Sequence, residues 1–327
     1  MNRRSFIYSS VLSSTGLVVA ARDLSFSREV ENGKRVGIIG LDTSHSEVFT
    51  RMINSGSPDM NGYRVIAAYE LGSKDIASAL NLRPGVTAKV REMGVEIVDS
   101  IEALLGKVDV VLLESNDGRP HLEQALPVFK AGKRIFIDKP VAASLDGAKA
   151  IFKAAAQHNT PVFTSSALRF DANVRQVVGG SIGNVTGADV YTPAEMEPHH
   201  SDLAWYAIHG VEMLFTVMGP GCKSVSRTYR DGTDLTVGVW SDGRIGTVRG
   251  IRTGASNIAG TAFGTKGIAP LGPFSGYEPL VKQIVTFFET GKVPVSPAET
   301  LEIFSFIEAA DLSRKKGGKT IQLPMNG

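Results

Sequence analysis

Three features of the sequence predict an α/β protein with two domains, the first built on a doubly wound parallel sheet. The length of 327 residues suits two ordinary domains better than one small core. Up to about residue 165, apolar runs alternate with helical segments, an order typical of right-handed βαβ units. From residue 166 onward, short runs of alternating polarity predict an α+β domain with a mostly antiparallel, open sheet.

In the first domain, residues 34–165, each expected strand is a short apolar run of the kind buried on both faces of a parallel sheet. These strands are expected at residues 35–40, 64–70, 95–98, 108–113, 134–137 and 161–163. Helical segments are expected at 47–54, 76–80, 101–105, 122–131 and 144–158. Strands and helices in this order favour a doubly wound sheet with a ligand crevice at its carboxyl edge.

In the second domain, residues 166–327, the expected strands lie at 185–191, 224–229, 235–240, 245–249 and 259–263. Asp231-Gly232 and Asp242-Gly243 separate three of them and are typical hairpin turns. Helices are expected at 203–218, 279–289 and 298–314, interrupting or covering the sheet.

The composition excludes several classes of protein. It is 43% hydrophobic and 21% charged, as in an average globular chain, and the formal net charge is +2. We therefore expect no binding to nucleic acid or to anionic membranes. No long apolar stretch follows the N-terminus, so no stable membrane insertion is expected. Cys222 is the single cysteine, which excludes an internal disulfide and a cysteine-cluster metal site.

Residues 1–21 have the pattern of a twin-arginine export signal. Arg3 and Arg4 precede a short, weakly apolar segment that ends in Val19-Ala20-Ala21. The alternatives are a mitochondrial-type presequence and an uncleaved anchor. We expect export to the periplasm or beyond, with residues 22–33 as a linker.

The turn after the first expected strand carries a partial dinucleotide-binding fingerprint. Aligned on Gly40, the second and third glycine positions hold Asp42 and His45. Asp42 places a negative charge where a pyrophosphate would approach, whereas Thr43, Ser44 and the helix N-terminus could hold a phosphate. Alternatively, residues 44–47 form a capping box and the turn only caps its helix.

Three further motifs follow in order along the chain. Asp138-Lys139-Pro140 comes after an expected buried strand, His209 lies in the segment 205–212, and Gly264-Thr265-Lys266-Gly267 precedes the C-terminal helices. In this order, residues 34–324 resemble the glucose–fructose oxidoreductase, inositol dehydrogenase and rhizopine-catabolism (Gfo/Idh/MocA) family. The resemblance implies a Rossmann domain with a nicotinamide dinucleotide in its crevice and a carbohydrate or polyol over it.

The resemblance also implies roles for single residues. Lys139 and His209 are the expected catalytic residues, and Arg169 and Trp205 join His209 as substrate-binding residues. The expected cofactor-binding residues are Gly40, Asp42, Thr43, Ser44, His45, Glu70, Asn116, His121, Asp138 and Lys139. Trp205 stands where the family has the aspartate that partners the histidine.

Each of these roles has a structural alternative. Lys139 in a partly desolvated cleft can act as a general acid or base, or it is a surface lysine at a strand end. His209 can exchange a proton near neutral pH, oriented by Glu212 one turn on, or it is a core histidine. The loop with Glu195, Glu197, His199, His200 and Asp202 is expected to be a solvated rim, so no metal is expected.

The sequence thus predicts an NAD(P)-dependent oxidoreductase that acts on a sugar, a polyol or a derivative by hydride transfer. Because an exported enzyme meets no free nicotinamide cofactor, NAD or NADP is expected to be tightly bound. The alternatives are a redox-neutral glycoside hydrolase, lyase or epimerase with bound NAD, and a carbohydrate-binding protein without the cofactor. The expected partner is a small carbohydrate, and the family suggests a homo-oligomer.

Overall fold

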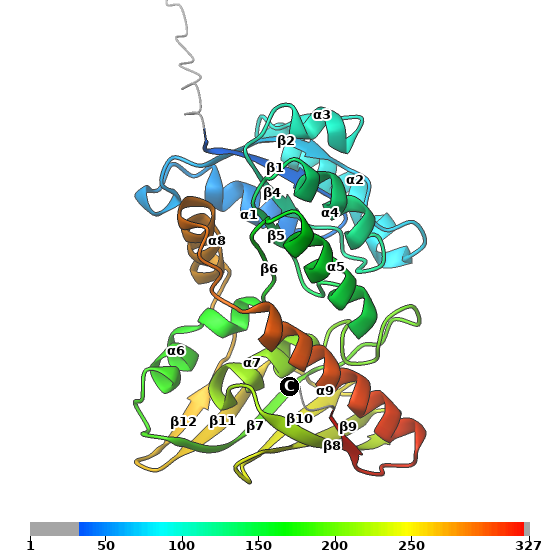
Figure 1. The fold of residues 1–327 in the computed structure, drawn as a ribbon, viewed down its shortest axis with the longest axis vertical. Coiled ribbons are helices and arrows are strands. Elements are labelled where there is room, and N and C mark those ends of the chain that lie inside the picture. The colour runs from blue at the N-terminus through cyan, green and yellow to red at the C-terminus, as the bar shows by residue number, and fades with distance from the viewer. Residues whose placement is uncertain (1–32, 324–327) are drawn as a thin grey trace, which may run out of the picture.

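A computed structural model describes residues 33–323 as two sheets with helices packed on them (Figure 1). The export signal expected at residues 1–21, and all but the last residue of the linker, lie outside the described residues. Each helix between residues 33 and 323 is too short or too polar to span a bilayer.

The first sheet is fully parallel, and its order is β3-β2-β1-β4-β5-β6. Its strands are β1 (Arg35–Ile39), β2 (Arg64–Tyr69), β3 (Glu96–Val98), β4 (Val110–Leu113), β5 (Ile135–Ile137) and β6 (Val162–Phe163). Chain order reverses between β1 and β4, and in doubly wound sheets the ligand crevice opens at this point, beyond the carboxyl ends of the strands. The predicted doubly wound parallel sheet is confirmed.

Helices cover both faces of this sheet because β1 alternates its side chains between them. The helices are α1 (Ser44–Ile53), α2 (Ala77–Glu92), α3 (Ile101–Leu105), α4 (His121–Lys130) and α5 (Leu145–Gln157). Val36 and Ile38 pack in one core with Phe49 of α1, whereas Ile39 packs in the other with Phe129 of α4. The α2 helix continues through Pro84 because Val86 and Val90 are buried in the first core, so it extends well beyond the expected residues 76–80.

The second sheet has the order β12-β11-β7-β10-β9-β8-β13. Its strands are β7 (Val185–Pro193), β8 (Cys222–Arg230), β9 (Thr233–Trp240), β10 (Ile245–Ile251), β11 (Ala259–Gly264), β12 (Ile268–Leu271) and β13 (Ile321–Gln322). Its pairs are antiparallel except β7 with β10. The mostly antiparallel sheet and both Asp-Gly turns are therefore confirmed, whereas β12 and β13 were not expected.

The remaining helices pack on the second sheet or return to the first domain. They are α6 (Ala172–Val178), α7 (Ile208–Met218), α8 (Glu278–Thr290) and α9 (Pro297–Lys315), with short 3-10 helices at Pro58–Met60 and Ala167–Phe170. α7 and α9 pack on one face of the second sheet. α8 returns to the first domain, lies beside α1 (Figure 1), and buries Leu280, Ile284 and Phe288 in the core that holds Phe49.

A buried ion-pair network fixes the start of the segment that leads into α7. Arg227 on β8 is fully buried and donates to Asp234 on β9 at 2.5 Å. It also donates to Asp202 at 2.9 Å and to Asp311 on α9 at 3.0 Å. The network anchors Asp202, and α7 begins at Ile208 and not at residue 203 as expected.

We predict that Arg227→Ala lowers the free energy of unfolding by about 3–5 kcal/mol, since it removes one partner of a buried ion pair. Arg244→Ala removes an arginine whose partner, Asp242, is exposed, and should leave the unfolding curve unchanged. Urea denaturation of both variants measures the difference. Equal stability of the two variants would contradict a structural role for the network.

Candidate active site

The crevice begins at Gly40, directly after β1. Gly40 has a φ of +88°, and a Cβ there would lie 2.5–2.7 Å from atoms of Ser115 in the loop after β4. Only glycine permits this close approach. The fold therefore requires a glycine at the first position of the fingerprint.

Asp42, at the second glycine position, is fully buried and ties three loops together. Its Oδ2 accepts a hydrogen bond from the backbone N–H of Ser73 at 2.5 Å, after β2. Its Oδ1 accepts from the backbone N–H of Asn116 at 2.9 Å, after β4. Its charge is thus stabilised by backbone amides at the floor of the crevice, and Asn116 meets this site through its main chain.

The capping box over residues 44–47 would make Ser44 the N-cap of α1, but the N-cap lies one residue earlier. Thr43 is the N-cap, because its backbone is extended and its Oγ1 accepts from the backbone N–H of His45 at 3.4 Å. Glu47 pairs with Arg51 and Lys89 instead of closing a capping box.

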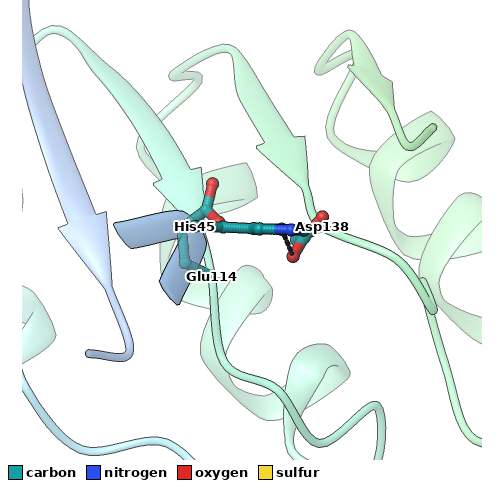
Figure 2. Close-up of side chains that lie close together, drawn as sticks. All are labelled: His45, Glu114 and Asp138. Carbon is teal, nitrogen blue, oxygen red and sulfur yellow. Dashed lines mark hydrogen bonds and ion pairs between the residues drawn. The ribbon is translucent and has the colours of Figure 1, made fainter. Parts of the chain in front are cut away.

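His45, Glu114 and Asp138 form a buried cluster at the carboxyl ends of β4 and β5 (Figure 2). His45 Nδ1 lies 2.6 Å from Asp138 Oδ2, and its Nε2 lies 3.0 Å from the Tyr277 hydroxyl. Both carboxylate oxygens of Glu114, and Oδ1 of Asp138, have no hydrogen-bond partner among the described residues. Glu114 was not among the expected site residues, although an acid directly after an apolar strand was a usable signal. Tyr277, 232 residues from His45 in the sequence, gave no such signal.

The two acids of the cluster differ in their electrostatics. Burial raises the pKa of Glu114, and the charge of Asp138 raises it further. The pKa of this carboxyl therefore lies well above its usual range. Burial also raises the pKa of Asp138, but the charges and hydrogen bonds of His45 and Lys139 outweigh it and lower the value to about 2. Asp138 is therefore an ionised acceptor, and His45 Nδ1 donates to it.

Lys139 and His209 approach each other from the two domains. Lys139 follows β5 and is 8% exposed, while His209 is in the first turn of α7 and equally buried. Burial, followed by the positive charge of Lys139, lowers the pKa of His209 well below its ordinary value. The imidazole is therefore neutral near pH 7, and Ser166 Oγ lies 2.7 Å from its Nδ1. Ser166 therefore orients His209. The prediction that Glu212 orients His209 is wrong.

Glu212 instead belongs to a buried ion-pair group with Arg169. Arg169 donates through Nε to Glu212 at 2.5 Å and through Nη1 to Glu299 of α9 at 2.6 Å. These ion pairs lie within the second domain and account for the position of Arg169, so substrate binding by Arg169 stays a prediction. Trp205 packs against His200, with ring centroids 4.9 Å apart, and its contact with substrate also stays a prediction.

His121 and Glu70, both expected near the cofactor, differ in burial. His121 is fully buried, and its ring nitrogens lie 3.0 Å from the Val141 carbonyl and 2.8 Å from the Ser115 carbonyl. It therefore holds the loops after β4 and β5 together. Glu70 is half-buried at the end of β2, and its ribose contact stays a prediction.

The acid- and histidine-rich loop before α7 does not gather into a metal-binding group among residues 33–323. His199 is exposed and contacts Glu197. The side chain of His200 is buried, and its Nε2 accepts from the backbone N–H of Gly118 at 3.0 Å. Burial lowers the pKa of His200 to about 4, because it outweighs the charges of Asp117 and Glu197.

The residues present fit a dinucleotide, with a changed pyrophosphate turn. A cavity of about 480 Å³ opens beside the end of β2, a size and position that suit an adenosine group. Its lining includes Tyr69, Leu71, Gly72, Ser73, Lys74, Arg83 and Gln124. Since Asp42 uses the amides of Ser73 and Asn116, the phosphates would be held by Thr43, Ser44 and the N-terminus of α1.

Comparisons with known proteins agree with this geometry. The model of the GFO_IDH_MocA oxidoreductase family, with an NAD-binding Rossmann fold, matches residues 34–166. The solved myo-inositol dehydrogenase from Lactobacillus casei, in complex with NAD(H) and myo-inositol, superposes with a TM-score of 0.72 at 18% identity, covering 90% of this chain and 97% of that one. The scyllo-inositol dehydrogenase of the same organism, with NAD(H) and scyllo-inositol, gives 0.69 at 17% identity, covering 88% and 98%. At this identity these likenesses show the fold.

Two curated relatives match shorter segments. Inositol 2-dehydrogenase 3 of Saccharopolyspora erythraea is 28% identical over 192 residues, which are 55% of this chain and 52% of that protein. The 1,5-anhydro-D-fructose reductase of Ensifer adhaerens is 32% identical over 107 residues, 31% of this chain and 32% of that protein. The chain thus spans about half the length of the first relative and a third of the second.

We predict that Asp42→Asn lowers the free energy of unfolding by about 1–3 kcal/mol, because one amide N–H₂ then faces a backbone N–H donor. Asp146→Asn, at a side chain that is 93% exposed, is the matched control and should leave stability unchanged. Denaturant unfolding of both variants gives the comparison. A neutral Asp42→Asn would show that the carboxylate does not hold the three loops.

The lowered pKa of His200 makes stability depend on pH. The unfolded chain protonates this histidine near pH 6.5, but the folded chain does so only near pH 4, so stability falls as pH drops through this window. We predict that His200→Gln loses about 2 kcal/mol less stability between pH 7 and pH 5 than the original protein. Exposed His158→Gln is the control, and a pH dependence of His200→Gln identical to that of the original protein would contradict the buried neutral imidazole.

Proposed function

We propose that the chain transfers hydride between a nicotinamide cofactor and a sugar or polyol, because the model of the Gfo/Idh/MocA oxidoreductase family matches residues 34–166. The observation that carries the proposal is the approach of Lys139 and His209 from two domains. The inositol and anhydrofructose named for the relatives indicate a polyhydroxylated substrate.

The cofactor would lie along the carboxyl edge of the first sheet. Its adenosine would occupy the cavity next to Ser73 and Lys74, and its phosphates would meet Thr43 and Ser44 at the start of α1. When bound, the nicotinamide ring supplies the group that accepts or gives the hydride. Tight retention of NAD or NADP is part of the proposal.

Lys139 is proposed as the group that exchanges a proton with the substrate hydroxyl. When an alcohol is oxidised to a ketone, its O–H proton leaves as its C–H hydrogen departs, and a positioned amine can take this proton. Lys139 is buried and lies beside the side chains of Glu114 and Asp138. His209 is neutral, so it can accept a hydrogen bond from a substrate hydroxyl and orient it.

Export and self-association are further parts of the proposal. The twin-arginine pattern of residues 1–21 supports transport of the folded, cofactor-loaded chain to the periplasm. One face of the second sheet leaves Tyr191, Val239 and Ile245 exposed, and these apolar side chains support a homo-oligomer built through that face.

We predict that Lys139→Ala lowers kcat by about 10²- to 10⁴-fold, because the proton-exchanging group is lost while the rest of the crevice remains. Turnover of inositols and sugars is followed by the absorbance of reduced nicotinamide with NAD⁺ and with NADP⁺. Lys149→Ala, on the exposed side of α5, is the control and should leave kcat unchanged. Undiminished turnover by Lys139→Ala would exclude Lys139 from the reaction.

A further inference from the structure

The cluster of His45, Glu114 and Asp138 is a set of acceptors without enough donors. The three residues are 6%, 0% and 2% exposed. Three of their four carboxylate oxygens have no hydrogen-bond partner among the described residues. A buried polar atom without a partner costs about 1–3 kcal/mol, and more when it is charged, so three at one point need an explanation.

A cation explains these atoms better than protonation does. A proton on Glu114 would remove its charge but leave its hydroxyl and carbonyl oxygens without partners, as well as Asp138 Oδ1. Lys139 lies near both acids, yet among the described residues it donates no hydrogen bond to the three orphaned carboxylate oxygens. A divalent ion can be ligated by all three side chains at once.

We propose that His45, Glu114 and Asp138 bind a divalent transition-metal ion of the Mn²⁺, Fe²⁺, Co²⁺ or Zn²⁺ class. One ligand atom from each residue lies within 4.8 Å of the other two (Figure 2). Two ligands on one such ion are at most about 4.4 Å apart, so the side chains need to move by less than about 1 Å. One imidazole and two carboxylates form a donor set suited to these ions and not to soft Cu(I).

Tyr277 supports the histidine in this arrangement. If Nδ1 ligates the metal, the neutral imidazole takes the tautomer that carries its single proton on Nε2. The Tyr277 oxygen, 3.0 Å from Nε2, can accept that N–H and fix the ring. The protein would then supply three ligands, the number that it supplies in catalytic zinc sites.

This site can bind a metal whether or not the chain has the proposed redox activity, although two of its ligands lie beside Lys139. It differs from the acidic loop before α7 that the sequence singled out. Its ligands come from α1 and from the ends of β4 and β5, which the fold itself brings together. The expectation of no metal was based on that loop and did not consider Glu114.

The test is metal binding by the full chain. Protein stripped with a chelator is titrated with Co²⁺, followed by its visible absorption, and then with Zn²⁺ as competitor. Glu114→Gln removes one ligand, and Glu123→Gln, on the exposed side of α4, is the matched control. We expect one Co²⁺ per chain for the original protein and for Glu123→Gln, with at least about 100-fold weaker binding by Glu114→Gln.

Thermal stability provides a second readout, because the presence and the absence of a metal site predict opposite orders of Tm for the original protein and Glu114→Gln in the presence of Zn²⁺. With a bound ion, added Zn²⁺ raises the Tm of the original protein and leaves that of Glu114→Gln unchanged. Without a metal site, Glu114→Gln only removes an unpaired buried carboxylate and becomes more stable than the original protein in the presence of Zn²⁺. That result, or equal Co²⁺ binding by all three proteins, would overturn the proposal.

Discussion

The crevice depends on one electrostatic constraint, which is the compensation of acids buried at the carboxyl edge of the first sheet. Asp42, Glu114 and Asp138 are each at most 2% exposed. An ionised carboxylate away from water is strongly unfavourable unless donors or positive charges surround it. Asp42 has two backbone amides, and Asp138 has His45 and Lys139. Glu114 has no hydrogen-bonding partner among the described residues, which is why a bound cation follows from the same constraint.

The residues around these buried acids come from both domains. Tyr277 reaches His45 from the segment before α8, and His209 reaches the surroundings of Lys139 from α7. α8 itself is packed in the core of the first domain, so this approach does not rest on loops alone. The site that the proposed hydride transfer needs is therefore assembled by contacts distant in sequence, with a neutral imidazole and an amine on facing elements.

The sequence predicted the parallel sheet and the hairpins because their signals are local. Apolar runs marked β1 and β4, and Asp-Gly pairs marked the turns at β9. It could also place Gly40 and Lys139, which lie next to such runs. It could not give the partner of a side chain: Glu212 was expected at His209, but the long-range pair with Arg169 determines its position. The cap at Thr43 was missed although its hydrogen bond, from the backbone N–H of His45, is local.

The most direct measurement is to denature protein purified without added cofactor and identify the released nucleotide by mass spectrometry. We expect NAD(H) or NADP(H) in a stoichiometric amount, held by the start of α1 and the cavity beside β2. If no nucleotide is released and calorimetry detects no binding of added NAD⁺ or NADP⁺, Asp42 and His45 have closed the pyrophosphate turn. That result would contradict the oxidoreductase function.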